Sequence, residues 1–260
     1  MRNIVTVSFL AIVFLLCSSN TLEFKKAYRV RTVVIDAGHG GKDSGCTGKF
    51  SQEADVALQL ALQVGSMIEK NLPDVKVIYT RKTDNFVELI DRAGIANKNN
   101  ADLFLSIHLN SGPSSAYGTE TYTMGLHTSE GNLNVAKREN AVILQEDNYR
   151  ENYNGFDPKS PQSHILFALH QSAHLDNSIR FADKIEKEFK HKVGRSSRGV
   201  KQAGFLVLWK SYMPSVLIEC GFLTNPNEEK FLNDKSGQSY MAAGIYRAFK
   251  DYKQDLEAMN

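Results

Sequence analysis

Two histidines and two glutamates in this chain stand where a metal-assisted reaction would use them. His39, His108 and Glu219 each come at the end of a short apolar run rich in β-branched residues, and Glu53 lies near the start of a stretch with helical periodicity. Ligands of open α/β sheets bind at the carboxyl ends of the strands. We therefore expect these four side chains to converge on one crevice.

The chemistry of this set favours zinc. Two imidazoles and one carboxylate form a common catalytic zinc site, in which one coordination position stays open for water or substrate. Mixed nitrogen and oxygen donors suit Zn²⁺, whereas sites built from oxygen alone suit Mg²⁺ or Ca²⁺. Any single histidine at a strand end is more often a structural residue, so the set by itself is a weak signal.

Strand-like and helix-like patterns alternate along most of the chain. This alternation predicts a three-layer α/β domain, with a mainly parallel central sheet flanked by helices. The middle of the chain is polar and predicts a helical, loop-rich insertion at about residues 125–163, which in a compact fold usually carries function or forms a lid. Strands are expected at residues 32–36, 75–79, 103–108, 118–124, 205–208 and 216–219, and helices at about 56–68, 87–98, 135–144, 165–189 and 238–256.

The first residues are typical of a secretory leader rather than of the fold. One positive charge at Arg2 precedes an apolar run at residues 4–16, which is short for a membrane-spanning helix. We expect a signal peptide at residues 1–19, a catalytic domain at 31–257 and secretion to the periplasm or cell envelope. A buried N-terminal helix is the alternative. Residues 14–17 also resemble a lipoprotein box, although Leu16 departs from the small residue expected there, so a lipid anchor on Cys17 stays open.

Composition and cysteine usage restrict the function only broadly. The 260 residues are 42% hydrophobic and 23% charged, as in an ordinary globular protein, and the formal net charge of +2 does not indicate a nucleic-acid partner. Cys46 and Cys220 remain after the leader. Because Cys220 lies in an apolar strand pattern, it is expected to pack as a small hydrophobic residue, and whether Cys46 and Cys220 form a disulfide stays open.

Several motifs, taken in order, resemble one known family. The chain resembles the zinc-dependent N-acetylmuramoyl-L-alanine amidases of the amidase-3 family over roughly residues 31–250. The resemblance lies in Val34-Ile35-Asp36-Ala37-Gly38-His39-Gly40-Gly41-Lys42-Asp43, Glu53, Tyr79-Thr80-Arg81, Leu89-Ile90-Asp91-Arg92-Ala93, Ser106-Ile107-His108-Leu109-Asn110-Ser111 and Pro214-Ser215-Val216-Leu217-Ile218-Glu219-Cys220-Gly221-Phe222-Leu223-Thr224-Asn225.

The resemblance implies a reaction and a role for each residue of the set. His39, Glu53 and His108 would be the ligands of one Zn²⁺, and Glu219 would match the catalytic glutamate. The reaction would be hydrolysis of the amide between N-acetylmuramic acid and L-alanine in peptidoglycan, for wall remodelling or daughter-cell separation. Zinc lowers the pKa of a bound water to about 7, and Glu219 would act as general base and then acid. The alternative for Glu219 is a buried salt bridge.

Other candidate residues are less specific. Arg81 and Arg92 would either contact an acidic peptide stem or brace loops, and bracing is favoured. Asn110 would either position substrate or orient a ligand. Residues 136–143 resemble a helix of the cell-division subgroup, in which a glutamate blocks the zinc until a partner protein displaces the helix. Glu139 aligns with that glutamate and is an autoinhibitory candidate; its alternative is a solvated residue on a charged helix face.

Two rival functions stay open at this point. A zinc peptidase with the same ligands would shorten stem peptides instead of releasing them intact. A non-catalytic module that binds or regulates the wall would need no working metal site, but the complete ligand set and Glu219 make this unfavourable.

Overall fold

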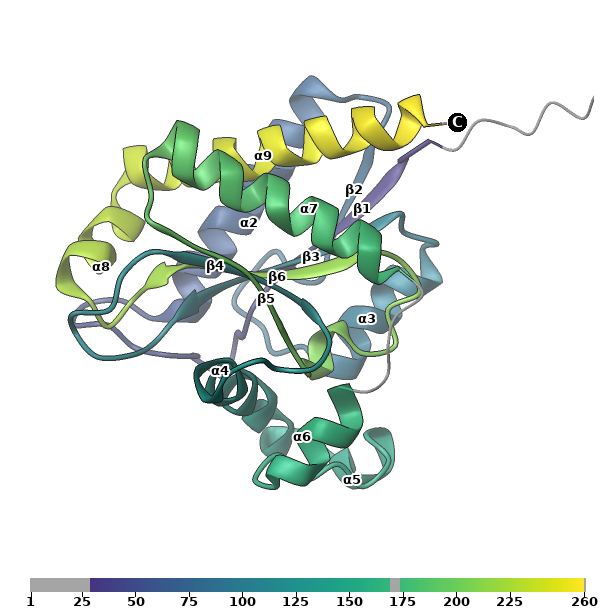
Figure 1. The fold of residues 1–260 in the computed structure, drawn as a ribbon, viewed down its shortest axis with the longest axis vertical. Coiled ribbons are helices and arrows are strands. Elements are labelled where there is room, and N and C mark those ends of the chain that lie inside the picture. The colour runs from purple at the N-terminus through teal and green to yellow at the C-terminus, as the bar shows by residue number, and fades with distance from the viewer. Residues whose placement is uncertain (1–28, 169–173, 260) are drawn as a thin grey trace, which may run out of the picture.

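The fold is a sandwich of three layers, as the sequence predicted (Figure 1). The computed structural model describes residues 29–168 and 174–259, so the expected leader and Cys17 lie outside the described residues. A six-stranded sheet separates an upper layer of helices from a lower one. Within the described ranges, no helix combines the length and hydrophobicity needed to cross a membrane.

The sheet is mainly parallel, and its order brings distant segments together. Its strands are β1 (Thr32–Ala37), β2 (Lys76–Tyr79), β3 (Leu103–Asn110), β4 (Thr119–Met124), β5 (Ser197–Ala203) and β6 (Ser215–Phe222), in the order β2-β1-β3-β6-β4-β5. Only the β4–β6 pairing is antiparallel. The central strands β3 and β6 are buried along their whole length, which explains their nearly continuous apolar sequences.

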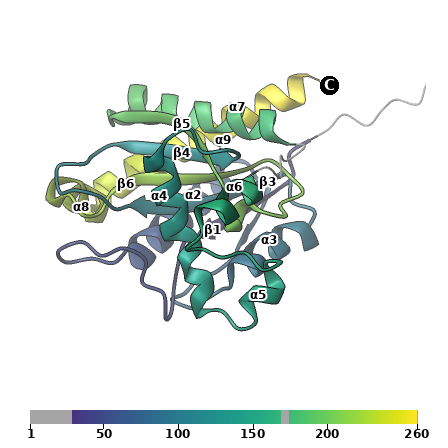
Figure 2. The same ribbon diagram turned by 60° about the horizontal axis from the view of Figure 1, so that its bottom comes forward.

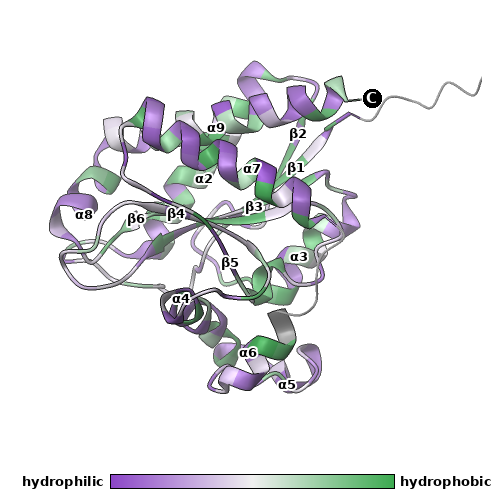
Figure 3. Ribbon diagram, viewed as in Figure 1, coloured by the Kyte–Doolittle hydropathy of each residue, from purple (hydrophilic) through white to green (hydrophobic). Residues whose placement is uncertain are grey.

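Helices cover both faces of the sheet. The upper layer contains α2 (Glu53–Asn71), α7 (Leu175–Glu188) and α9 (Lys235–Ala258), with the short α8 (Pro226–Asn233) at one end. The lower layer contains α3 (Leu89–Lys98) and the insertion, with α4 (Glu130–Asn140), α5 (Tyr149–Asn152) and α6 (Pro161–Ala168). Figure 2 shows α4 lying across the lower side of the sheet. Figure 3 shows many hydrophilic residues along α7, whereas α6 of the insertion carries hydrophobic residues, of which Ile165 and Leu166 are exposed.

Two apolar cores form because neighbouring strand residues point to opposite faces. Val33 and Ile35 of β1 pack in the upper core, whereas Val34 between them packs in the lower core. The lower core also contains Val135 of α4, so the insertion helix is part of the packed domain. Cys46 and Cys220 are free thiols, and Cys220 is buried in the upper core.

Several predicted elements were wrong. Residues 205–208 form a 3₁₀ turn, Leu206–Leu208, instead of a strand: they are apolar because they are buried in the lower core. The long helix predicted at 165–189 is two helices, α6 and α7, which lie in different layers. The insertion helix begins at Glu130, earlier than predicted, because the Ser129 side chain caps it. Strand β5 and helix α8 were not predicted.

Candidate metal centre

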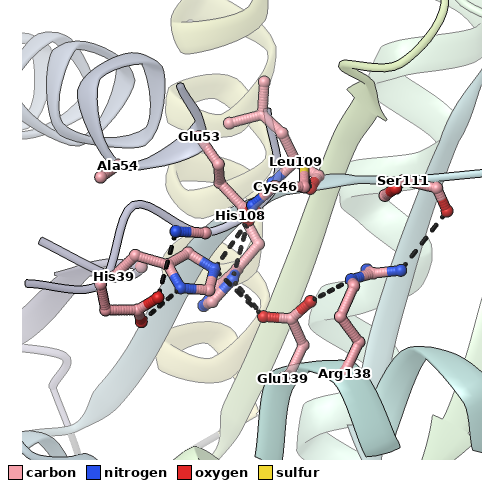
Figure 4. A network of polar contacts seen from close by, with 12 residues as sticks. His39, Cys46, Glu53, Ala54, His108, Leu109, Ser111, Arg138 and Glu139 are labelled. Carbon is pink, nitrogen blue, oxygen red and sulfur yellow. Dashed lines mark hydrogen bonds and ion pairs between the residues drawn. The ribbon is translucent and has the colours of Figure 1, made fainter. Parts of the chain in front are cut away.

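The predicted ligands meet at the carboxyl ends of β1 and β3 (Figure 4). His39 lies in the loop after β1, His108 lies on β3, and Glu53 is the first residue of α2. Glu53 Oε1 is 3.1 Å from His39 Nε2 and 3.2 Å from His108 Nδ1. Glu139 of α4 joins them, with its Oε2 3.2 Å from His39 Nε2 and 3.1 Å from His108 Nδ1.

The four donor atoms fit one zinc ion. They are buried and lie within 4.8 Å of one another. Four donors placed tetrahedrally at zinc bond lengths are about 3.3 Å apart, close to the separations just given. His39 Nε2 and Glu139 Oε2 are buried without a hydrogen bond, which is rare for polar atoms in a native fold. This group could therefore hold a metal.

Neighbouring groups fix the orientation of the ligands. The other ring nitrogen of His39, Nδ1, is 2.7 Å from Asp43 Oδ2, which is the usual arrangement behind a metal-bound histidine. Backbone N–H groups of Cys46 and Leu109 donate to the two oxygens of Glu53, each at 2.9 Å. Asp43 was not predicted to orient His39, although its position four residues after the histidine was a usable signal.

Two buried arginines hold the loop that carries His39. Arg81 donates to the carbonyls of Ala37 and Gly38, and Arg92 donates to those of Ala37 and His39. Both guanidinium groups are almost fully buried. This placement favours the bracing role of the two alternatives, because neither arginine offers a surface to substrate. His39 adopts a φ of 60°, which this network of carbonyl contacts helps to maintain.

Glu219 lies beside the metal group but on a different strand. It is the cross-strand partner of His108 in the β3–β6 pairing, and it is completely buried. Arg138 of α4 reaches it, with Nη2 3.3 Å from Glu219 Oε1, while Arg138 Nε donates to Glu139 Oε1 at 2.9 Å. Arg138 Nη2 also donates to Asn110 Oδ1 at 3.1 Å. Helix α4 therefore contacts both the metal group and the predicted catalytic carboxylate. We missed Arg138 in the sequence because it belongs to an ordinary run of charges.

Burial and charge shift the pKa values in this group strongly. Burial raises the pKa of Glu219 well above its ordinary value, although Arg138 opposes this effect. Burial lowers the pKa of His108, but Glu139 and Glu53 outweigh it and raise that pKa to about 9. Burial raises the pKa of Glu139, but Arg138 and the two histidines hold it well below its ordinary value. Several neighbouring groups with shifted pKa values thus lie together around the metal group, as is common at functional sites.

The family of the chain follows from comparison with known proteins. The model of the Amidase_3 family, N-acetylmuramoyl-L-alanine amidase, matches residues 33–251. The chain belongs to this family. It is therefore a hydrolase of the amidase class that acts on peptidoglycan.

Individual relatives agree with this placement. The chain is 32% identical over 234 residues to the amidase AmiA of Escherichia coli K12, covering 88% of this chain and 78% of AmiA. It is 34% identical over 239 residues to AmiC of Escherichia coli O6:H1, but covers only 55% of AmiC. The catalytic domain of CwlV from Bacillus (Paenibacillus) polymyxa has a TM-score of 0.63 at 31% identity, covering 87% of this chain and 99% of that one. AmiA and AmiC fit the cell-division subgroup expected from residues 136–143.

Proposed function

We propose that this amidase depends on one zinc ion, held by His39, Glu53 and His108, and cuts the bond between N-acetylmuramic acid and L-alanine. The observation that carries the proposal is the convergence of these donors from two strand ends and the start of a helix. Glu53 Oε1 lies 3.1 Å from His39 Nε2 and 3.2 Å from His108 Nδ1. When bound, zinc would polarise the scissile carbonyl and lower the pKa of water.

Glu219 is proposed to move the proton. It is the residue paired with His108 across the β3–β6 ladder and is completely buried, so its carboxylate is placed to act as a general base beside the metal group. It would accept a proton from the attacking water and return it to the leaving amine. Burial excludes bulk water from this carboxylate, so the proton exchange would stay within the site.

We also propose that the structure represents a self-inhibited state. Glu139 would supply a fourth protein ligand, which converts an open catalytic zinc site into a closed one. Arg138 would neutralise Glu219 at the same time, because it pairs with both glutamates. Activation would then require a partner protein, or another event, that moves α4 away. Secretion to the cell envelope, with or without a lipid on Cys17, is part of the same proposal.

One digestion experiment tests the reaction. Purified peptidoglycan is incubated with the zinc-loaded protein and with its Glu139→Gln variant, each with and without a chelator, and the fragments are identified by mass spectrometry. We expect intact stem peptides that begin with L-alanine, released faster by the variant and not in the presence of chelator. Shortened stems would instead show a peptidase. The non-catalytic alternative would be supported by two results together. The zinc-loaded protein and its Glu139→Gln variant would both release no fragments, and a His39→Ala variant would still bind the wall.

A further inference from the structure

We propose that Arg198 and Lys201, on the edge strand β5, form a subsite for a carboxylate group on the peptide half of the substrate. The inference rests on the proposed function, because it concerns how the peptide leaving group is recognised. Both side chains contact the same buried carboxylate, Glu120 of β4.

The basic pair continues a row of polar side chains that crosses the sheet. His108 of β3 is paired with Glu219 of β6, and Glu219 is paired with Glu120 of β4. Directly paired residues of neighbouring strands point to the same face. Glu120 therefore lies next to the predicted catalytic carboxylate, and Arg198 lies on the next strand outward. The row leads from the metal group to the edge of the sheet.

A bulge in β5 is what places both basic residues on this face. Ser197 is paired with Thr119 and Val200 with Thr121, so three steps along β5 correspond to two steps along β4. Gly199, within the bulge, has a φ of 86°, a conformation that glycine adopts without steric cost. Without the extra residue, side chains three positions apart would point to opposite faces. Bulges are often found next to active sites, where they redirect a side chain.

The charges in this group do not balance, which leaves a positive charge for a ligand. Glu120 is buried and already accepts hydrogen bonds from Tyr122 Oη at 2.6 Å and Asn110 Nδ2 at 3.1 Å. Two cations, Arg198 and Lys201, share this single carboxylate. The Arg198 side chain is 44% exposed, and within the described residues its terminal nitrogens make no hydrogen bond. Its guanidinium lies over the Phe222 ring, which holds it in one place.

The distance suits a carboxylate on the second residue of the stem. Strands in a sheet are about 4.8 Å apart, so β5 lies about 10 Å from β6 and the Arg198 side chain spans part of that gap. Two residues of extended peptide span about 7 Å. A peptide whose first residue follows the scissile amide at Glu219 would thus bring its second residue to the basic pair. A guanidinium binds carboxylates with well-defined geometry, so an acidic residue at that place would be recognised.

Two muramyl peptides that differ in one group test the proposal. MurNAc-L-Ala-D-Glu carries a free α-carboxyl on the second residue, and MurNAc-L-Ala-D-isoglutamine carries an amide there. The Glu139→Gln protein should cleave the acid with a kcat/KM about tenfold above that of the amide, since a charged hydrogen bond is worth about that factor. The additional changes Arg198→Gln and Lys201→Met should reduce this ratio to near one.

A matched control separates recognition from mere support of the sheet edge. Arg247 makes the same kind of contact, Nε to the carboxylate of Glu188, and is 39% exposed, but it pairs α9 with the end of α7 in the upper layer. Arg247→Gln should leave the ratio unchanged. A double variant that loses activity equally on both peptides would show a structural role and overturn the proposal, as would equal cleavage of both peptides by the parent.

Binding separates failure of the subsite from failure of the reaction. Calorimetric titration of the zinc-loaded protein that carries both Glu139→Gln and Glu219→Gln should show tighter binding of the acid peptide, and this preference should disappear with Arg198→Gln. If neither peptide is cleaved but the binding preference is found, the proposed reaction is wrong and the subsite stands. If both peptides bind equally, the subsite is wrong whatever the cleavage assay shows.

Discussion

Replacement of Glu139 by glutamine should activate the enzyme without an activating partner. The change keeps the size of the side chain but removes its charge. In the structure the Glu139 carboxylate is 3.2 Å from His39 Nε2, 3.1 Å from His108 Nδ1 and 2.9 Å from Arg138 Nε. Arg138 and Glu139 are neighbours on α4 itself, but the contacts with the two histidines exist only while α4 lies over the site. Their loss should therefore destabilise the closed state and leave the open state unaffected.

The magnitude follows from the value of such a contact. A hydrogen bond to a charged group contributes about 1.5–3 kcal/mol. At 1.4 kcal/mol per factor of ten, losing one such contribution raises the ratio of open to closed molecules by about tenfold to 150-fold. Two contacts join Glu139 to the site, but glutamine can keep weaker polar contacts with the same histidines, so the value for a single contact is the one to expect.

The assay is the initial rate at which purified peptidoglycan releases soluble stem peptides at a fixed zinc concentration. Glu130→Gln is the control. Glu130 lies on the same helix and is exposed, and its replacement by glutamine removes the same charge. Zinc content is measured in all proteins, so that a loss of metal is not mistaken for a loss of rate. Unchanged or lower activity of Glu139→Gln at full zinc content would refute the inhibitory role of α4.

Three further changes test other parts of the structure. Asp43→Asn should weaken zinc binding by about tenfold to a hundredfold, because it alters the partner of the His39 ring; competition with a chelating dye measures this, and unaltered affinity would contradict the orienting role. Glu219→Gln should retain one zinc per chain but lose about a hundredfold to ten-thousandfold in rate, and a variant of normal rate would remove Glu219 from the mechanism. Burial raises the pKa of Glu186 despite hydrogen bonds from Ser197, Thr121 and Thr119. Because the pKa of this carboxyl is higher in the folded state, the group favours folding at pH values below 4.5 and loses that contribution as the pH rises. Glu186→Gln should therefore raise the melting temperature at pH 7.5 and not at pH 4. Equal shifts at both pH values would contradict the assignment.

The sequence predicted the layers and the metal group because both depend on strong local patterns. Strands β1, β3 and β6 are buried on both faces and begin with nearly continuous apolar runs, and this pattern identifies a buried parallel sheet. His39 and His108 could be placed because each follows or ends such a strand. Family resemblance then assigned roles that spacing alone left open. These residues converge because β1 and β3 are parallel neighbours whose carboxyl ends lie at the same edge of the sheet. The alternation of strands and helices already predicted a parallel sheet of this kind.

What the sequence could not predict depends on tertiary contacts. Strand β5 is polar and lies at a sheet edge, so it lacks the alternation that reveals a half-buried strand. The 3₁₀ turn Leu206–Leu208 has the composition of a strand, because burial alone determines that composition. The role of Arg138 is visible only when α4 is placed against β6. The bulge at Gly199 shows itself only in the pairing with β4.

The residue that follows Glu139 adds a second restraint on α4. Asn140 is buried, donates from Nδ2 to the Gly204 carbonyl at 2.7 Å and accepts from the Leu206 N–H at 2.8 Å. These bonds join the end of α4 to a backbone segment that belongs to the lower core and does not involve the ion. Removing zinc would thus leave the helix docked, so a chelated molecule should remain protected from proteolysis in this region. If α4 closes the site as proposed, activation would also have to break these two hydrogen bonds, and the rate of that step would limit how soon the wall is cut.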